Sequence, residues 1–168
     1  MRKIIMQKEE LFLTTTSYED IEYLSKLFED YELMRYTFAK TFSKEEAQEY
    51  IKSCFNFSGN LGFSPLFFKE NIIGFGGVFK FDKNSYELGY ILDKKYWKKG
   101  LATKAASMQR DYITNTLCSQ AVATAHPDNL ASQRVLQKCG FEFQKDIFMP
   151  ERGQRKLFVY DERKLFFK

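Results

Sequence analysis

Hydrophobic and polar residues change their spacing along this chain, and the changes predict an alternation of strands and helices. Alternation over residues 11–16 predicts a first strand, and apolar residues at helical spacing predict helices over about 18–29 and 43–55. A serine followed three residues later by a carboxylate opens each helix, as in a capping box. Residues 31–38 follow neither period, and we expect a short helix or turn with exposed aromatic side chains there.

The second part of the chain repeats strand and turn signals around one helical crossover. Gly74, Gly76 and Gly77 lie inside a predicted strand, where glycines indicate a bulge or a close approach of two backbones. Gly140 is placed to end a helix in the left-handed conformation. The remaining predicted elements are, in order, strands over 63–69, 72–81 and 85–93, a helix from about 101 to 115, a strand over 120–125, a helix over 130–138, and final strands over 141–149 and 156–163.

The order of these elements predicts one domain over residues 1–168 with an α/β (α+β) fold. Most strands follow one another through turns and are expected to be antiparallel. The strand–helix–strand unit over 85–126 makes its two strands parallel through a right-handed crossover. We therefore expect a mixed, mostly antiparallel sheet of about seven strands with helices on both faces. Ligands of such sheets bind near the carboxyl ends of the parallel strands, where the loop over 94–99 lies.

Composition and charge narrow the class of protein. The 44% hydrophobic and 17% aromatic residues, including 18 Phe, fit a soluble domain with an aromatic core. The net charge of +4 fits an anionic ligand and is too small by itself to indicate nucleic acid. No apolar run approaches the roughly 18 residues of a membrane span, and the N-terminus turns acidic before a signal-peptide core. We expect a cytoplasmic protein that binds no membrane.

The cysteines and the single histidine do not indicate a metal site or a catalytic nucleophile. Cys54, Cys118 and Cys139 show no metal or CxxC spacing, and reduced thiols are the simplest account. His126 alone cannot build a His-rich metal site or a His-based triad. We therefore expect no metal.

The stretch from Glu87 to Thr103 reads as a strand, a basic loop and the first turn of a helix. Such a turn directs free backbone N–H groups at one point and suits a phosphate. Gly100 permits a ligand to approach the backbone closely. The alternative is a solvated basic turn, the usual role of a lysine cluster. Walker A and GxGxxG patterns are absent, which disfavours an ordinary nucleotide fold. The lysines that add positive charge here are Lys94, Lys95, Lys98, Lys99 and Lys104.

Two further sites have both a structural and a functional interpretation. Asn129 is an ordinary N-cap residue for the helix that contains Ser132. Glu87 is a strand carboxylate whose structural role would be pairing with a lysine on a neighbouring strand, and whose functional role would be that of a general base.

Three runs of residues resemble the GNAT superfamily of N-acetyltransferases, in particular its RimJ/RimL branch of ribosomal-protein acetyltransferases. The runs are ELGYIL from Glu87, YWKKGLATKA from Tyr96, and NLASQRVLQKCGF from Asn129. The opening ELFLTTTSYED from Glu10 is also similar, so that the resemblance covers most of the chain and is loose only over residues 31–61.

The family's cofactor motif Q/R-x-x-G-x-G/A aligns with Trp97, Gly100 and Ala102. Tryptophan replaces the motif's usual first residue, and Lys98 replaces a glycine often found there. The resemblance implies that the backbone of residues 98–103 holds the pyrophosphate of acetyl-CoA. It also implies that the strand over 90–92 pairs with the amides of the pantetheine arm.

The same resemblance assigns roles to the polar residues. Asn129 would contact the pantetheine arm. Ser132 would lie near the CoA sulfur, either donating a proton to the thiolate or only contacting the cofactor. Glu87 would act as a base through water, so Glu87 and Ser132 are the implied catalytic residues. The implied cofactor-binding residues are Tyr90, Ile91, Leu92, Trp97, Lys98, Lys99, Gly100, Leu101, Ala102, Thr103, Asn129 and Ser132.

The function that this resemblance implies is acetyl transfer from acetyl-CoA to a primary amine, either a protein N-terminal α-amine or another amine, by direct attack. One alternative is a small-amine enzyme acting on polyamines or antibiotic-like amines, for which Glu45, Glu46 and Glu49 would attract cations. Another is a non-catalytic CoA-sensing or nucleic-acid-binding module with the same fold. We expect the protein to bind acetyl-CoA and an amine, and we do not expect it to bind nucleic acid. We expect it to be a monomer or a homodimer.

Overall fold

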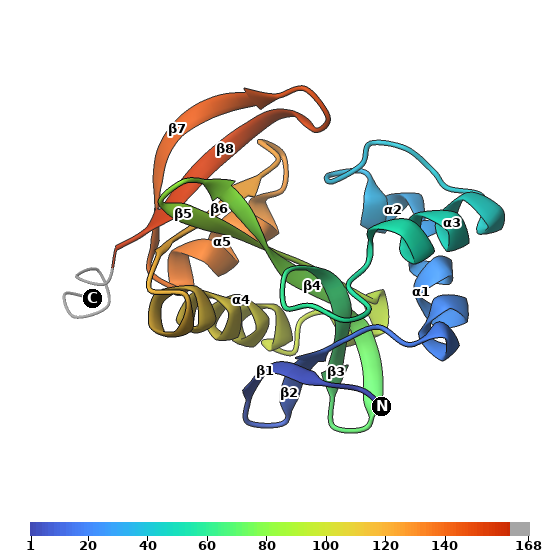
Figure 1. The fold of residues 1–168 in the computed structure, drawn as a ribbon. Coiled ribbons are helices and arrows are strands. Elements are labelled where there is room, and N and C mark those ends of the chain that lie inside the picture. Colours follow the sequence, from blue (N-terminus) through green and yellow to red (C-terminus); the bar gives the residue numbers. More distant parts are fainter. Residues whose placement is uncertain (162–168) are drawn as a thin grey trace.

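The computed structural model describes residues 1–161 as an eight-stranded sheet flanked by helices (Figure 1). The strand order is β1-β2-β3-β4-β5-β6-β8-β7. The strands are β1 (Ile4–Lys8), β2 (Leu11–Thr14), β3 (Gly62–Phe68), β4 (Asn71–Asp82), β5 (Ser85–Leu92), β6 (Gln120–Ala125), β7 (Phe141–Met149) and β8 (Gly153–Tyr160). The helices are α1 (Ile21–Phe28), α2 (Tyr31–Met34), α3 (Lys44–Cys54), α4 (Leu101–Asp111) and α5 (Leu130–Lys138), with the short turns η1 (Tyr18–Asp20), η2 (Lys94–Tyr96) and η3 (Tyr112–Thr116).

The predicted mixed sheet is confirmed, with one strand more than the seven expected. β1 is absent from the sequence-based expectation because the alternation in IIMQK is too short to be recognised without its antiparallel partner β2. β8 begins at Gly153, three residues before its predicted start, because the turn after β7 takes only residues 150–152. Residues 162 and 163 of that predicted strand lie outside the described residues.

One parallel pair interrupts the otherwise antiparallel sheet. β5 and β6 are joined through α4, as predicted, but their register covers only residues 85–87 and 120–122. Beyond that point the two strands part. β5 continues to Leu92 along β4, while β6 continues to Ala125 along β8. The parting leaves one edge of β5 without a neighbouring strand.

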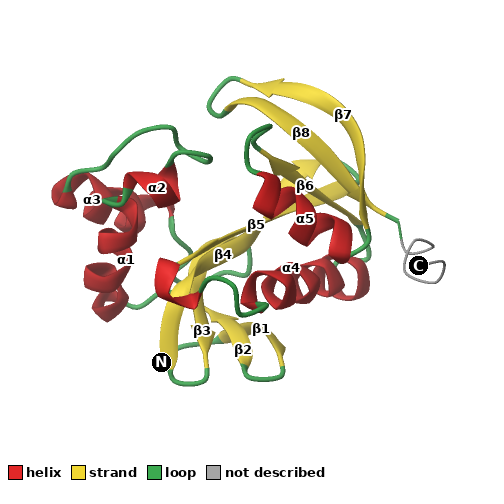
Figure 2. Ribbon diagram, turned by 180° about the vertical axis from the view of Figure 1, so that it is seen from behind, coloured by secondary structure: helices red, strands yellow, loops and turns green. Residues whose placement is uncertain are grey.

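Two cores fix the helices against the sheet, and α1, α2 and α3 form a group separate from α4 and α5 (Figure 2). α4 and α5 pack on mainly aliphatic residues of the central strands. The other group encloses an aromatic cluster around Phe28, whose ring stacks on that of Phe75 in β4 with centroids 5.1 Å apart. Large rings pack well only with neighbours of matching shape. This cluster accounts for much of the excess of phenylalanine.

Glycines in β4 let neighbouring backbones approach closely, as the sequence predicts. A Cβ atom on Gly74 would lie 2.0 Å from the carbonyl oxygen of Ile91, and one on Gly77 would lie 2.0 Å from that of Gly62. No side chain fits at such distances, so both positions require glycine. Because Ile91 belongs to β5, the contact at Gly74 sets how β5 lies on β4 beside the point where β5 and β6 part.

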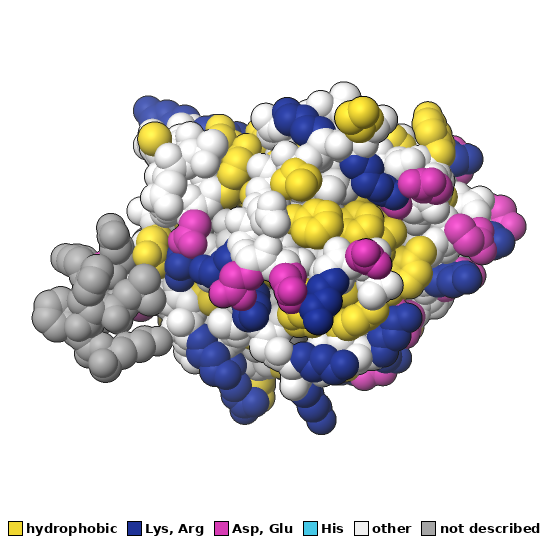
Figure 3. All heavy atoms as spheres, turned by 90° about the horizontal axis from the view of Figure 1, so that it is seen from below, with side chains coloured by type: hydrophobic (Ala, Val, Ile, Leu, Met, Phe, Trp, Pro, Cys, Tyr) yellow, Lys and Arg dark blue, Asp and Glu magenta, His cyan; other side chains and the backbone are white. Residues whose placement is uncertain are grey.

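The face seen from below the view of Figure 1 carries charges of both signs. Lysine and arginine side chains alternate with carboxylates around a group of hydrophobic side chains (Figure 3). This face therefore lacks the continuous basic stripe typical of nucleic-acid-binding proteins. None of the helices formed by the first 161 residues is long and apolar enough to cross a membrane.

Candidate functional site

A cleft of about 430 Å³ lies where β5 and β6 part. Successive side chains of a strand point to opposite faces, so Glu87 and Tyr90 of β5 line different sides of this cleft. Tyr90 contacts α5, whereas Glu87 contacts the turn between β7 and β8. The cleft therefore has two sides, one facing α5 and one facing the β7–β8 hairpin.

The loop from β5 to α4 presents backbone N–H groups beside the carboxyl end of β5. Gly100 is the N-cap of α4 with φ +76°, and Lys98 is also left-handed with φ +62°. The first helical bond runs from the Lys104 N–H to the Gly100 carbonyl at 3.2 Å, so the N–H groups of residues 101–103 precede the helix's own hydrogen bonds. Such a helix start attracts phosphate. Lys98 adopts a conformation that favours glycine, although it carries a side chain.

The lysines around this loop differ in their partners. Lys94, Lys95 and Lys104 all lie within ion-pair distance of carboxylates. Lys94 makes the closest pair, 2.7 Å from Glu32, and this contact raises its pKa. Within the described part of the chain, the two lysines at 98–99 have no carboxylate partner. The positive charge available to a phosphate therefore comes from these two, and not from all five.

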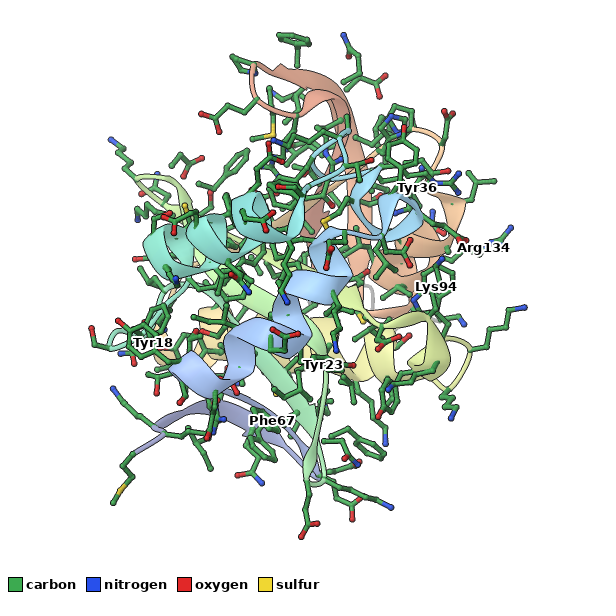
Figure 4. The ribbon with its side chains drawn as sticks, turned by 90° about the vertical axis from the view of Figure 1, so that its right-hand side faces the viewer. Tyr18, Tyr23, Tyr36, Phe67, Lys94 and Arg134 are labelled. Atoms are coloured by element: carbon green, nitrogen blue, oxygen red, sulfur yellow. The ribbon has the colours of Figure 1, made fainter. Side chains whose placement is uncertain are left out.

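Several contacts hold the loop in place. The Tyr23 hydroxyl of α1 donates to the Asp93 carboxylate at 2.6 Å, and Lys94 reaches the acidic residues at the start of α2 (Figure 4). The indole N–H of Trp97 donates to the Leu92 carbonyl at 3.0 Å and folds the loop back onto β5. Trp97, predicted to bind the cofactor, thus has a structural contact as well.

The free edge of β5 and the start of α5 complete this side of the cleft. Residues 88–92 pair with β4 on one edge only, so an extended chain of amides has an edge to join. Asn129 caps α5 through its Oδ1, which accepts from the Ser132 N–H at 3.2 Å. Its Nδ2 has no partner among the residues described, and so the capping and the ligand-binding interpretations are compatible.

Ser132 and Tyr90 meet across the cleft. The Ser132 Oγ lies 3.3 Å from the Tyr90 hydroxyl, and either atom can donate. Burial raises the pKa of Tyr90 well above its usual value, and the hydrogen bond to Ser132 offsets this only in part. The phenol is therefore protonated at neutral pH. The sequence singles out Tyr90 for its backbone alone, because nothing in it indicates a contact between residues on β5 and α5.

On the other side of the cleft, Glu87 belongs to a hydrogen-bonded network. Arg152 donates to its Oε1 at 3.0 Å and to its Oε2 at 2.9 Å, and Thr124 donates to Oε1 at 2.9 Å. The structural partner of Glu87 is thus an arginine from the β7–β8 turn, where the sequence suggested a lysine on a neighbouring strand. Sequence reasoning missed Arg152 and Thr124, because residues 150–153 indicate only a turn.

Arg155 of β8 joins the same network and reaches the loop after α2. It donates from Nε to the Thr124 hydroxyl at 3.2 Å, and from Nη1 to the Tyr36 carbonyl. Figure 4 shows Tyr36 on that loop. By contrast, none of the three glutamates at 45, 46 and 49 lines the cleft. Glu46 instead accepts from the N–H of Ser43 at the start of α3.

The site offers donors for an anionic, amide-bearing ligand. The start of α4, the free edge of β5 and the Asn129 amide fit the phosphate and amide groups of CoA. Residues 1–161 contain no cluster of three His, Cys, Asp or Glu side chains able to hold a metal ion.

Comparisons with known proteins agree with this geometry. An uncharacterised N-acetyltransferase of Bacillus subtilis, YnaD, is 25% identical over 134 residues, which cover 77% of this chain and 78% of that protein. The structure of a GNAT-family acetyltransferase from Bacillus anthracis superposes with a TM-score of 0.82 at 22% identity, covering 97% and 99% of the two chains.

Two further solved structures share the fold. The RimL acetyltransferase of ribosomal protein L7/L12 gives a TM-score of 0.75 at 15% identity, covering 95% of this chain and 94% of that one. A spermidine N-acetyltransferase from Vibrio cholerae, solved with CoA and spermine, gives 0.76 at 17% identity, covering 95% and 99%. Residues 10–142 match the acetyltransferase (GNAT) domain family. The chain therefore belongs to the GNAT family of N-acetyltransferases.

Proposed function

We propose that this protein transfers an acetyl group from acetyl-CoA to a primary amine, such as a protein N-terminal α-amine. The observation that carries the proposal is the parting of β5 from β6 beside the start of α4. The free edge of β5 is available to the pantetheine amides, and the N–H groups at the start of α4 are available to the pyrophosphate. Both lie on one continuous segment of the chain. We assign the cofactor to residues 90–92 and 97–103, together with Asn129 and Ser132.

The cleft suits direct attack of an amine on the thioester. Acetyl-CoA supplies an activated acetyl group, and CoA leaves as a thiol. Two sides of one cleft hold the two reactants together, so that the attack becomes effectively unimolecular. Backbone N–H groups on the free edge of β5 would polarise the thioester carbonyl.

Glu87 is our candidate for the base. Amines with pKa values of about 8 to 10 are mostly protonated near neutral pH and must lose a proton before they attack. Within the described structure, Oε1 of Glu87 accepts two hydrogen bonds, whereas Oε2 accepts one, from Arg152. A carboxylate oxygen accepts two, so Oε2 has room for a water that relays the proton.

Ser132 and Tyr90 are our candidates for the acid. Their hydroxyl groups, 3.3 Å apart, lie on the α5 side of the cleft, opposite Glu87. A proton passed along this pair would neutralise the departing thiolate. Base and acid would then lie on opposite sides of the cleft, one taking a proton from the amine and the other giving a proton to the thiolate.

The acceptor separates this proposal from its alternatives. A polyamine or antibiotic-like amine would use the same cofactor side, so only a panel of acceptors can distinguish the two classes. A non-catalytic module that binds nucleic acid would lose affinity steeply with salt and would release no CoA.

Calorimetry with acetyl-CoA and an assay of free CoA release over a panel of amines test the function. We expect acetyl-CoA to bind and at least one amine to release CoA. Gly100→Trp should block the pyrophosphate site. Gly153→Trp is a matched control, since both glycines have positive φ and open space at the Cβ position. No binding by the wild-type protein at millimolar acetyl-CoA would refute the proposal, and equal affinity in both variants would refute the phosphate assignment.

A further inference from the structure

The β7–β8 side of the cleft contains a buried positive charge that forms no ion pair with any of residues 1–161. Arg155 lines the cleft and is only 5% exposed. In the described residues, Arg152 forms an ion pair with Glu87, but no carboxylate lies within ion-pair distance of Arg155. Buried charged groups in proteins are almost always paired. Arg155 is an exception, and its surroundings indicate why.

Neutral oxygen atoms hold the guanidinium of Arg155. Its Nε donates to the Thr124 hydroxyl at 3.2 Å, its Nη2 donates to the Thr124 carbonyl at 3.1 Å, and its Nη1 donates to the Tyr36 carbonyl. A guanidinium has five N–H groups. One N–H on each Nη therefore remains for another acceptor. These contacts orient the group without neutralising it.

The neighbouring charges do not neutralise Arg155. Glu151 of the β7–β8 turn also lines the cleft, but among the described residues it forms no ion pair with Arg155. Arg152 and Glu87 cancel each other through their two-pronged contact. Burial and, less strongly, the charge of Arg152 lower the pKa of Arg155, and Glu87 raises it in part; the result is a pKa of about 10, so the group is still protonated at neutral pH. Lys80 turns away, and its Nζ donates to the Lys83 carbonyl at 3.2 Å.

We propose that Arg155 is the anion-binding residue of the acceptor subsite, and that the acceptor carries a carboxylate close to its reactive amine. The carboxylate would belong to a free amino acid or to an acidic side chain near the N-terminus of a peptide. Its oxygens would accept the remaining N–H groups of Arg155 and supply the missing negative charge. Polyamines and other polycations would place like charges against this group. The inference rests on the proposed acetyl transfer and narrows its acceptor.

Pairs of acetylated products that differ only in a carboxylate test this subsite. Binding to the CoA-loaded protein is measured by calorimetry or by ligand-observed NMR, which does not depend on turnover. N-acetylglycine against N-acetylglycinamide represents the free amino acid. N-acetyl-Gly-Asp amide against N-acetyl-Gly-Asn amide represents the peptide. In at least one pair we expect the compound with the carboxylate to bind roughly 10- to 100-fold more tightly than its amide analogue, the difference that a hydrogen bond to a charged group makes.

Variants assign the preference to Arg155. In Arg155→Gln the ratio should fall to about one, whereas Arg155→Lys should keep part of it because the charge remains. CoA affinity should be unchanged in both variants, and thermal unfolding shows whether each is folded. Equal binding within both product pairs, or no binding in either, overturns the inference. A protein that binds no CoA at all overturns the proposed function itself, so the two failures are distinguishable.

Discussion

At the scale of single residues, several side chains of the site serve the fold and the chemistry together. Asn129 caps α5 with one amide atom and, among the described residues, leaves the other without a partner, and Trp97 anchors the loop whose N–H groups we assign to the pyrophosphate. Glu87 fixes the β7–β8 turn through Arg152 while it faces the cleft. A variant at such a position changes stability and activity together. Its test therefore needs a readout specific to the chemistry.

The role of Glu87 as a base predicts a pH-dependent defect. In Glu87→Gln we expect kcat at neutral pH to fall by roughly 10²-fold or more, the usual contribution of a general base. The defect should shrink as pH rises toward the pKa of the acceptor amine, because the amine then loses its proton to water unaided. Steady-state kinetics from pH 6.5 to 10 measure this. A defect that is constant with pH would indicate that Glu87 only positions Arg152.

The Tyr90–Ser132 pair predicts a different pattern. Tyr90→Phe removes the buried hydroxyl and keeps the ring, so we expect kcat to fall roughly 10- to 100-fold with acetyl-CoA affinity nearly unchanged. Ser132→Ala should have a smaller effect, since the Tyr90 hydroxyl remains. Single-turnover kinetics together with calorimetry separate the two effects. If Tyr90→Phe loses affinity and keeps its turnover, the phenol is a cofactor contact and not a proton donor.

At the scale of elements, the sequence predicts single helices and strands well. It predicts which strands pair only where a short turn joins them. β6 and α5 have their predicted bounds, because the turn at residues 127–129 ends the strand and Asn129 caps the helix. β1 is missed because its five residues become a strand through β2. The loop at Gly100 is predicted from residue types, whereas the contacts of Arg155 with Tyr36 and Thr124 join residues 119 and 31 positions apart. Residue patterns within a segment carry no information about such contacts.

The close packing of β4 on β5 predicts that replacing Gly74 by alanine destabilises the fold, whereas replacing Gly89 by alanine does not. In Gly74→Ala the new Cβ would meet the backbone of Ile91 at 2.0 Å, and no side-chain rotation relieves this. We expect a loss of about 2–3 kcal/mol in the free energy of unfolding, as for an overpacked core. In Gly89→Ala the nearest atom is 3.9 Å away, on Phe63. There we expect no loss, or a gain of about 0.4–1 kcal/mol from the restricted unfolded chain.

Urea unfolding of the two variants measures this difference. Because Ile91 lies on the free edge of β5, beyond the residues that pair with β6, Gly74→Ala should also weaken acetyl-CoA binding, measured on the folded variant by calorimetry. Equal stabilities for the two variants would mean that β5 can shift on β4, and would remove the argument that Gly74 sets the position of that strand.

At the scale of the whole molecule, two cores and one cleft are joined by polar contacts between distant segments. The aromatic core under α1 to α3 places the loop of Tyr36 opposite the β7–β8 hairpin, and Arg155 connects the two. The aliphatic core under α4 and α5 places Tyr90 beside Ser132. Composition predicts an aromatic core but not two separate cores, because a residue count does not say to which element or to which face of the sheet each ring belongs.

Partly buried tyrosines that pack against both cores predict that the protein loses stability in alkaline solution. Burial raises the pKa of Tyr23, Tyr50 and Tyr90, and that of Tyr50 reaches about 12. In the unfolded chain a tyrosine titrates near pH 10. Above pH 10 the unfolded chain therefore binds fewer protons than the folded one, and the free energy of unfolding falls as pH rises. Below pH 10 these groups have no such effect.

Each tyrosine contributes at most about 1.4 kcal/mol per pH unit to this fall, less where the ring is partly exposed. Urea unfolding from pH 8 to 11.5 should show a level region followed by a steep decline. Tyr50→Phe should flatten the decline, because one titrating group is gone and the ring stays in the aromatic core. Tyr18→Phe, at a side chain that is 74% exposed, should leave the slope unchanged. Identical slopes for the wild type and Tyr50→Phe would show that burial of Tyr50 in this core does not hold its proton.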